Sequence, residues 1–258
     1  MSELTEKPNA ALKDLLFRMA DDALIIGHRN SEWTGIGPIL EEDIAFSSLA
    51  QDKVGQAYNL YQLLNKLGEA EPDRLAFGRG VDTFKSAQFV EYPIGEYDFS
   101  IVRHFFFDHA EQLRYDLLKN SSYAPLASLA KKFRGEIKYH VYHANTWIKQ
   151  LAEGNEESRS RIQNSVNEAY PLAMSIFEPG SDEETLISEG IFVGEAELAE
   201  IWKARVLPIL ADLGISIPDV EKNPEVAFGG RKGKHTSFLA PLLEEMTEVN
   251  QIDPDAIW

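Results

Sequence analysis

The sequence predicts an all-α fold. Along most of its 258 residues, apolar side chains recur at steps of three and four, the period of one face of a helix. Glycine and proline stand near the ends of these stretches, where helices start and stop. No stretch alternates apolar and polar residues long enough to predict a sheet. Because no linker, repeat or change of composition divides the chain, we expect one helical domain over 1–258.

The first two long helices are predicted from apolar stripes. The first covers 10–29, soon after Pro8, and the second covers 39–67, directly behind Pro38. Gly68 follows the second stripe, and glycine commonly ends a helix because it adopts the left-handed conformation. Both helices are long enough to cross a whole domain.

The next two long helices follow a lengthy connection, 70–97, in which we expect at least one shorter helix. The third helix, 98–120, is apolar nearly all round at its centre, which is typical of a helix deep inside a bundle. Its aromatic residues exceed what one stripe can bury, so we expect some of them to pack against another subunit. The fourth helix covers 124–153.

Three further helices are expected after the first four, and they cover 157–177, 195–215 and 237–249. Pro171 and Pro208 should kink or interrupt two of them. Two pairs of long helices joined by a long middle connection are typical of a ferritin-like four-helix bundle, here with additional helices. Such bundles hold metals through inward-facing carboxylates, and two of their helices carry Glu-x-x-His.

Charge and composition exclude several functions. The chain has 25 Lys and Arg against 42 Asp and Glu, a net charge of −17, which repels nucleic acids and anionic membranes. It has no cysteine, which excludes disulfides and thiolate metal sites. A polar N-terminus and the absence of an apolar run of roughly 20 residues predict a cytoplasmic protein without a secretory signal.

Each of the four long stripes has an acid on or beside it, and a tyrosine and a histidine lie next to the last: Asp22, Asp52, Asp108, Glu136, Tyr139 and His140. Burying four carboxylates together is costly unless cations, protons or hydrogen bonds compensate. A di-metal centre would compensate, and so would a cluster of salt bridges and hydrogen bonds.

The spacing favours the polar cluster. Three residues after Asp52 stands Gly55, and three residues after Glu136 stands Tyr139, so both histidines of the di-iron pattern are missing. His140 lies four residues after Glu136 and has no counterpart on the second helix. We therefore expect a remnant carboxylate site without metal. The alternative is an independent carboxylate-bridged di-iron oxygenase that uses these acids.

Several sequence blocks, taken in order, resemble the C-subunit (PaaC) family of the bacterial phenylacetyl-CoA epoxidase. These blocks are DDALIIGHRNSEWTG (21–35), LEEDIAFSSLAQDKVGQA (40–57), EIKYH (136–140) and GGRKGKHT (229–236) followed by LAPLLEEM. The resemblance implies a ferritin-like subunit of a multicomponent oxygenase that forms the ring-1,2-epoxide of phenylacetyl-CoA during aerobic phenylacetate degradation.

The resemblance also implies a division of labour. In this family a homologous catalytic A-subunit holds the di-iron site and the CoA thioester, and a reductase delivers electrons from NADPH. The C-subunit is the structural partner of the A-subunit. The expectation for this chain is thus a non-catalytic subunit without a cofactor of its own, a homodimer alone and a hetero-oligomer in the complex.

A basic segment stands out in this acidic chain: Arg231, Lys232, Lys234 and His235. One interpretation is a contact with an acidic partner surface or with the phosphates of CoA. The other is a solvated loop that leads into the last helix, capped by Thr236 or Ser237.

Overall fold

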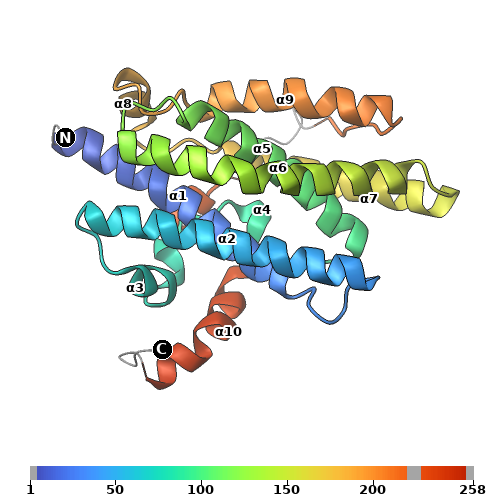
Figure 1. Cartoon of the computed structure of the whole chain (residues 1–258), viewed down its shortest axis with the longest axis horizontal. Coiled ribbons are helices and arrows are strands. Elements are labelled where there is room, and N and C mark those ends of the chain that lie inside the picture. The colour runs from blue at the N-terminus through green and yellow to red at the C-terminus, as the bar shows by residue number, and fades with distance from the viewer. Residues whose placement is uncertain (1–4, 220–227, 254–258) are drawn as a thin grey trace. The chain divides into compact units, whose positions relative to one another are not determined.

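The computed structural model describes residues 5–219 and 228–253, and it confirms the all-α class because these residues contain helices and no strand. The elements are α1 (Glu6–Ser31), α2 (Leu40–Lys66), α3 (Pro72–Phe77), η1 (Val81–Thr83), α4 (Gln88–Glu91), α5 (Tyr97–Leu118), α6 (Ala124–Ala152), α7 (Glu156–Ala173), η2 (Met174–Phe177), α8 (Glu183–Ser188), α9 (Glu195–Asp212), η3 (Gly230–Lys232) and α10 (Leu239–Ile252) (Figure 1). None of the helices in these two ranges has the length and apolar character needed to cross a membrane.

Contacts divide the chain into two compact units. One unit comprises Met1–Leu12 and Ile94–Phe228, and we call it the α5–α9 unit. The other comprises Lys13–Pro93 and Gly229–Trp258, and we call it the α1–α2 unit. The single domain expected over 1–258 stays a prediction.

In the α5–α9 unit, α5 is the central helix and packs against α6, α7 and α9. Its aromatic side chains are buried within this chain: Phe105, Phe106, Phe107 and Tyr115. The Phe106 ring contacts Trp202 of α9 at 5.5 Å, and Tyr115 contacts Phe133 of α6 at 5.3 Å between ring centroids. The expectation that these aromatic residues pack against another subunit is therefore wrong, because all four side chains are already buried.

The two internal prolines do not interrupt their helices. Pro171 lies near the end of α7, which continues as the 3-10 helix η2, and Pro208 lies inside α9. The start of α7 is fixed by Asn155, whose side chain accepts a hydrogen bond from the Ser158 amide at 2.9 Å. This is the capping interaction that satisfies an amide left free at a helix N-terminus.

In the α1–α2 unit, α2 is one uninterrupted helix of 27 residues (Figure 1). Its C-terminal end is followed, as predicted, by Gly68, which has φ of +95° and lets the Glu69 amide turn back to the Leu64 carbonyl at 3.1 Å. The long connection 70–97 contains α3, η1 and α4, which confirms the prediction of a shorter helix there.

Candidate functional site

The polar centre of the α5–α9 unit lies on α5 and α6. Asp108, His104 and His140 are all fully buried. His104 Nδ1 donates to Asp108 Oδ2 at 2.8 Å, and His140 Nδ1 lies 3.8 Å from Asp108 Oδ1. Asp108 therefore has its hydrogen-bonded partner four residues before it on its own helix. The structure brings the predicted residues Asp108 and His140 together.

The other two predicted residues of α6 lie closer to solvent. Glu136 is half-buried, and Tyr139 is 49% exposed. Burial raises the pKa of Tyr115 well above its usual value, and the charges of Glu111 and Glu136 raise it further. Glu136 therefore acts electrostatically on Tyr115, whereas the Tyr139 side chain reaches solvent.

On α2 the buried polar residues lie one position later than predicted. Asp52 is half-buried, but its neighbour Lys53 is 0% exposed and Gln56 is 1% exposed. Lys53 and Gln56 are three residues apart, the spacing that an acid and a histidine have on the ligand helices of a di-iron bundle. The sequence analysis named Asp52 on this helix and did not identify Lys53.

On α1, Asp21 is fully buried in the α1–α2 unit. The sequence had favoured the adjacent Asp22 as the residue of the carboxylate site. Asp21 Oδ1 accepts from the Tyr61 hydroxyl at 2.6 Å, and Oδ2 accepts from the Lys85 amide at 2.7 Å. Arg79 forms an ion pair with the same carboxylate. Burial and the negative charge of Asp21 raise the pKa of Tyr61 well above its usual value.

Asp22 has a different set of partners. Arg231 donates from Nη1 to Oδ1 at 2.8 Å and from Nη2 to Oδ2 at 2.7 Å, and the Ala87 amide also donates to Oδ1 at 2.7 Å. Arg231 Nη1 also donates to the Lys85 carbonyl at 2.7 Å. Asp22, predicted in the carboxylate site, and Arg231, predicted in the basic segment, thus form an ion pair with each other.

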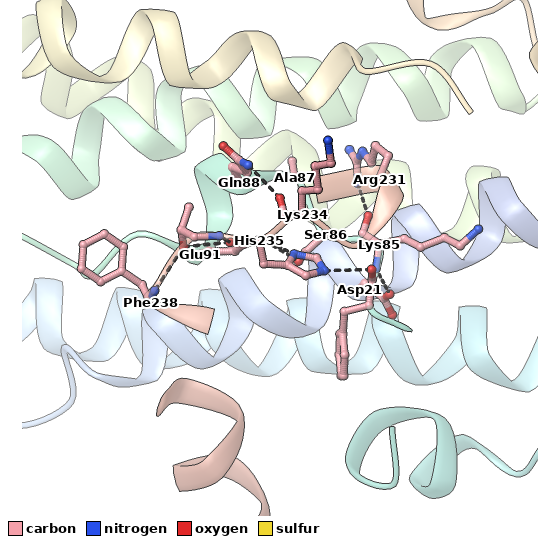
Figure 2. Close-up of polar contacts among 12 residues, drawn as sticks. Asp21, Lys85, Ser86, Ala87, Gln88, Glu91, Arg231, Lys234, His235 and Phe238 are labelled. Atoms are coloured by element: carbon pink, nitrogen blue, oxygen red, sulfur yellow. Dashed lines mark hydrogen bonds and ion pairs between the residues drawn. The ribbon is translucent and has the colours of Figure 1, made fainter. Parts of the chain in front are cut away.

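Glu91 is a third buried acid of this unit, and the sequence analysis missed it (Figure 2). Oε1 contacts His235 Nδ1 at 2.6 Å and accepts from the Ser86 hydroxyl at 3.0 Å. Oε2 accepts from the Thr236 amide at 2.7 Å and from its hydroxyl at 2.8 Å. Since the Phe84 carbonyl can only accept, His235 Nε2 donates to it at 3.0 Å.

The basic segment is therefore split between two environments. The side chains of Arg231 and His235 are buried and have partners within the unit, which differs from the expected contact with a partner or an anion. Lys232 and Lys234 are exposed, and for these two residues that contact stays a prediction. Thr236 binds the side chain of Glu91 at the approach to α10.

The donor set does not fit a carboxylate-bridged di-iron centre. None of the six histidines in the whole sequence has an aspartate or glutamate three residues before it. Over residues 5–219 and 228–253, no group of three His, Asp or Glu side chains is arranged to hold a metal ion. On α2 the buried pair is Lys53 and Gln56, and a protonated lysine has no lone pair for a metal.

Comparison with known proteins decides the family. A family model described as "Phenylacetic acid catabolic protein" matches residues 1–258. This chain belongs to the phenylacetic acid catabolic protein family. Within this family, it is 30% identical over 244 residues to the C-subunit of the 1,2-phenylacetyl-CoA epoxidase of Escherichia coli K12, covering 93% of this chain and 96% of that protein.

The A-subunit of the 1,2-phenylacetyl-CoA epoxidase of the same organism is 24% identical over 254 residues, covering 94% of this chain and 79% of that protein. The resemblance stated from the sequence blocks is confirmed. The all-α structure agrees with the ferritin-like fold predicted for a member of the phenylacetic acid catabolic protein family.

Proposed function

We propose that this chain is the structural, non-catalytic subunit of a cytoplasmic multicomponent phenylacetyl-CoA epoxidase in aerobic phenylacetate degradation. It pairs with a homologous A-subunit, which holds the di-iron centre, and stabilises it. The proposal is supported by the greater identity to the C-subunit relative, 30% against 24%, and by the coverage of nearly all of that relative.

The donor set is the observation that carries the non-catalytic assignment. In a di-iron bundle, each of two helices supplies an acid and a histidine that stands three residues after it. The sequence has no such pair, and α2 buries Lys53 and Gln56 at that spacing. Neither the Lys53 amine nor the Gln56 amide is a carboxylate or an imidazole, so a bundle with these residues keeps polar side chains inside without the ligands of the cofactor.

The buried acids of this chain then serve the scaffold. Asp108 binds His104 within α5, and Asp22 and Glu91 join segments of the α1–α2 unit that lie far apart in the sequence. Each contact requires its partners in fixed positions, because a buried carboxylate that loses its hydrogen-bond donors lowers the stability of the fold by about 3–5 kcal/mol. A scaffold with fixed helix positions can present a constant surface to the A-subunit.

Iron analysis tests the assignment. The purified chain is reconstituted anaerobically with Fe²⁺ and desalted, and its iron is measured by mass spectrometry beside the A-subunit of the same organism. We expect the A-subunit to retain about two irons per chain and this chain to retain far less. Two irons per chain, with oxygen-dependent turnover by this chain alone, would instead establish the independent di-iron oxygenase.

Gel filtration at micromolar concentration tests the pairing. We expect this chain to co-elute with the A-subunit when the two are mixed, and to elute as a homodimer by itself. Separate elution of the two proteins would contradict the proposed role in the complex, whatever the iron content.

A further inference from the structure

One face of α2 is exposed and carries no charge. Between Glu41 and Lys66, six positions of the helix are exposed: Ile44, Ser48, Gln51, Val54, Gly55 and Tyr58. Charged residues make up 26% of the chain, and the exposed positions of the similarly long α6 include Lys131, Lys132 and Lys138. The outer face of α2 therefore differs from an ordinary solvated helix surface.

The spacing of these positions is that of a helix-packing seam. Ile44, Ser48, Gln51, Gly55 and Tyr58 follow one another at steps of four, three, four and three. This repeat keeps the side chains in line along one face of the helix, and apolar residues in such a line can pack against a second helix. The apolar character continues into the segment before α2, where Ile36, Ile39 and Leu40 are exposed, and clustered exposed apolar residues mark interaction sites.

Gly55 supports the same interpretation. It lies near the middle of α2, and a Cβ built on it would meet nothing within 4 Å. A glycine inside a helix is less stable than alanine by roughly 0.5–1 kcal/mol, and no packing among the described residues requires it. A glycine at such a position allows the backbone of another molecule to approach closely. Ser48, seven residues earlier on the same line, is also small.

We propose that the outer face of α2 from Ile44 to Tyr58 is the docking surface for a long helix of the homologous A-subunit. This inference rests on the proposed function. The stretch from Ile44 to Tyr58 is about 22 Å long, so a face about 10 Å wide offers on the order of 200 Å². Each partner of a standard interface buries about 800 Å², so the occupant must run along this whole stretch and add contacts beyond it.

A homologous subunit meets this requirement. The A-subunit relative aligns with 94% of this chain and is therefore expected to have helices of matching length. A second copy of this chain is a poorer occupant of this face, because each copy has a net charge of −17 and like charges repel. None of the exposed residues from Ile44 to Tyr58 is charged, so these residues add no repulsion of their own against a partner.

The central experiment compares two lysine substitutions in the full-length chain. Ile44→Lys puts a charge in the seam, and Val249→Lys puts one on α10; the two residues are matched, at 59% and 60% exposed. We expect Ile44→Lys to raise the Kd for the A-subunit by about tenfold or more, because it buries a charge without a partner. Val249→Lys should leave the Kd within about twofold of the wild-type value. An unchanged Kd for Ile44→Lys, or equal losses for both variants, would overturn the proposal.

Gly55→Ala should change the stability of the chain and its affinity for the A-subunit in opposite directions. Replacing a helix glycine that has free space around it should raise the melting temperature of the isolated chain. The added methyl group should weaken the complex with the A-subunit several-fold, because it blocks the close approach. A variant that is more stable and binds with wild-type affinity would contradict the docking surface.

The outcomes separate the two proposals. If the wild-type chain forms no complex with the A-subunit, the proposed function fails. If the wild-type complex forms and Ile44→Lys binds equally well, only the docking surface fails. If Ile44→Lys abolishes a homodimer and leaves the complex with the A-subunit intact, the face belongs to a second copy and the proposed occupant is wrong.

Discussion

Arg231 in η3 holds Asp22 of α1 through two parallel hydrogen bonds of 2.8 and 2.7 Å, and both side chains are buried. The two residues are 209 positions apart. A bidentate arginine–carboxylate pair is among the stronger polar contacts in proteins. It therefore attaches the segment before α10 to the first helix of the chain.

Asp22→Ala should lower the free energy of unfolding by about 3–5 kcal/mol, because it leaves the buried guanidinium without a counter-charge. Urea unfolding followed by circular dichroism measures the change. The double variant Asp22→Ala/Arg231→Met should recover part of the loss, since it removes both charges. A loss below about 1 kcal/mol for the single variant would show that the pair is solvated.

Glu91→Gln tests the buried carboxylate that contacts His235. Both oxygens of Glu91 receive hydrogen bonds or contact His235, and the amide nitrogen of glutamine would place a donor where an acceptor is required. We expect a loss of about 2–3 kcal/mol. Ser86→Ala removes only one of the donors and should cost about 1 kcal/mol. Equal losses in thermal unfolding would contradict this ranking.

The buried imidazole of His109 should make stability fall in mild acid. Burial lowers the pKa of His109 below its usual 6.5, although its hydrogen bond to Asn145 opposes the shift. As the pH falls below 6.5 the unfolded chain takes up a proton that the folded chain resists, so stability is complete above this pH and decreases below it.

His109→Gln isolates this contribution, because glutamine can still donate to Asn145 and does not titrate. The free energy of unfolding, measured from pH 7.5 to pH 5, should fall less steeply for the variant than for the wild-type chain. Parallel curves for the two proteins would mean that His109 takes up its proton equally well in the folded state.

Trp202→Phe probes the core of the α5–α9 unit. Trp202 is fully buried and its Nε1 donates to the Phe106 carbonyl at 3.0 Å. Phenylalanine lacks the donor and leaves a cavity, so we expect a loss of about 2–3 kcal/mol in chemical unfolding. Trp147→Phe, at a half-buried position of α6, is the matched control and should lose less than half as much.

Local periodicity was sufficient to predict the helices. The uniformly apolar centre of 98–120 predicted the burial of α5, and Gly68 marked the end of α2, because both signals depend on side chains a few residues apart. The missing acid-x-x-His spacing is likewise a local property. The missing histidines could therefore be recognised from the sequence alone.

Single-residue register was harder to predict. On α2 the apolar stripe is broad, so Asp52 and Lys53 both lie near its edge. Adjacent residues differ by about 100° around a helix, and only the packing of neighbouring elements decides which side chain is covered. Lys53 is buried in the structure, and the periodicity of the sequence did not distinguish it from Asp52.

The sequence by itself determined the helical class, the long helices, the family and the absence of a di-iron ligand pattern. Tertiary structure alone decided that Asp22 meets Arg231, that Glu91 meets His235 and that the aromatic side chains of α5 are covered within this chain. The physical reason is the separation of the interacting residues along the chain. Helix formation is governed by residues three and four positions apart, whereas a buried ion pair depends on the path of the whole chain between its two residues.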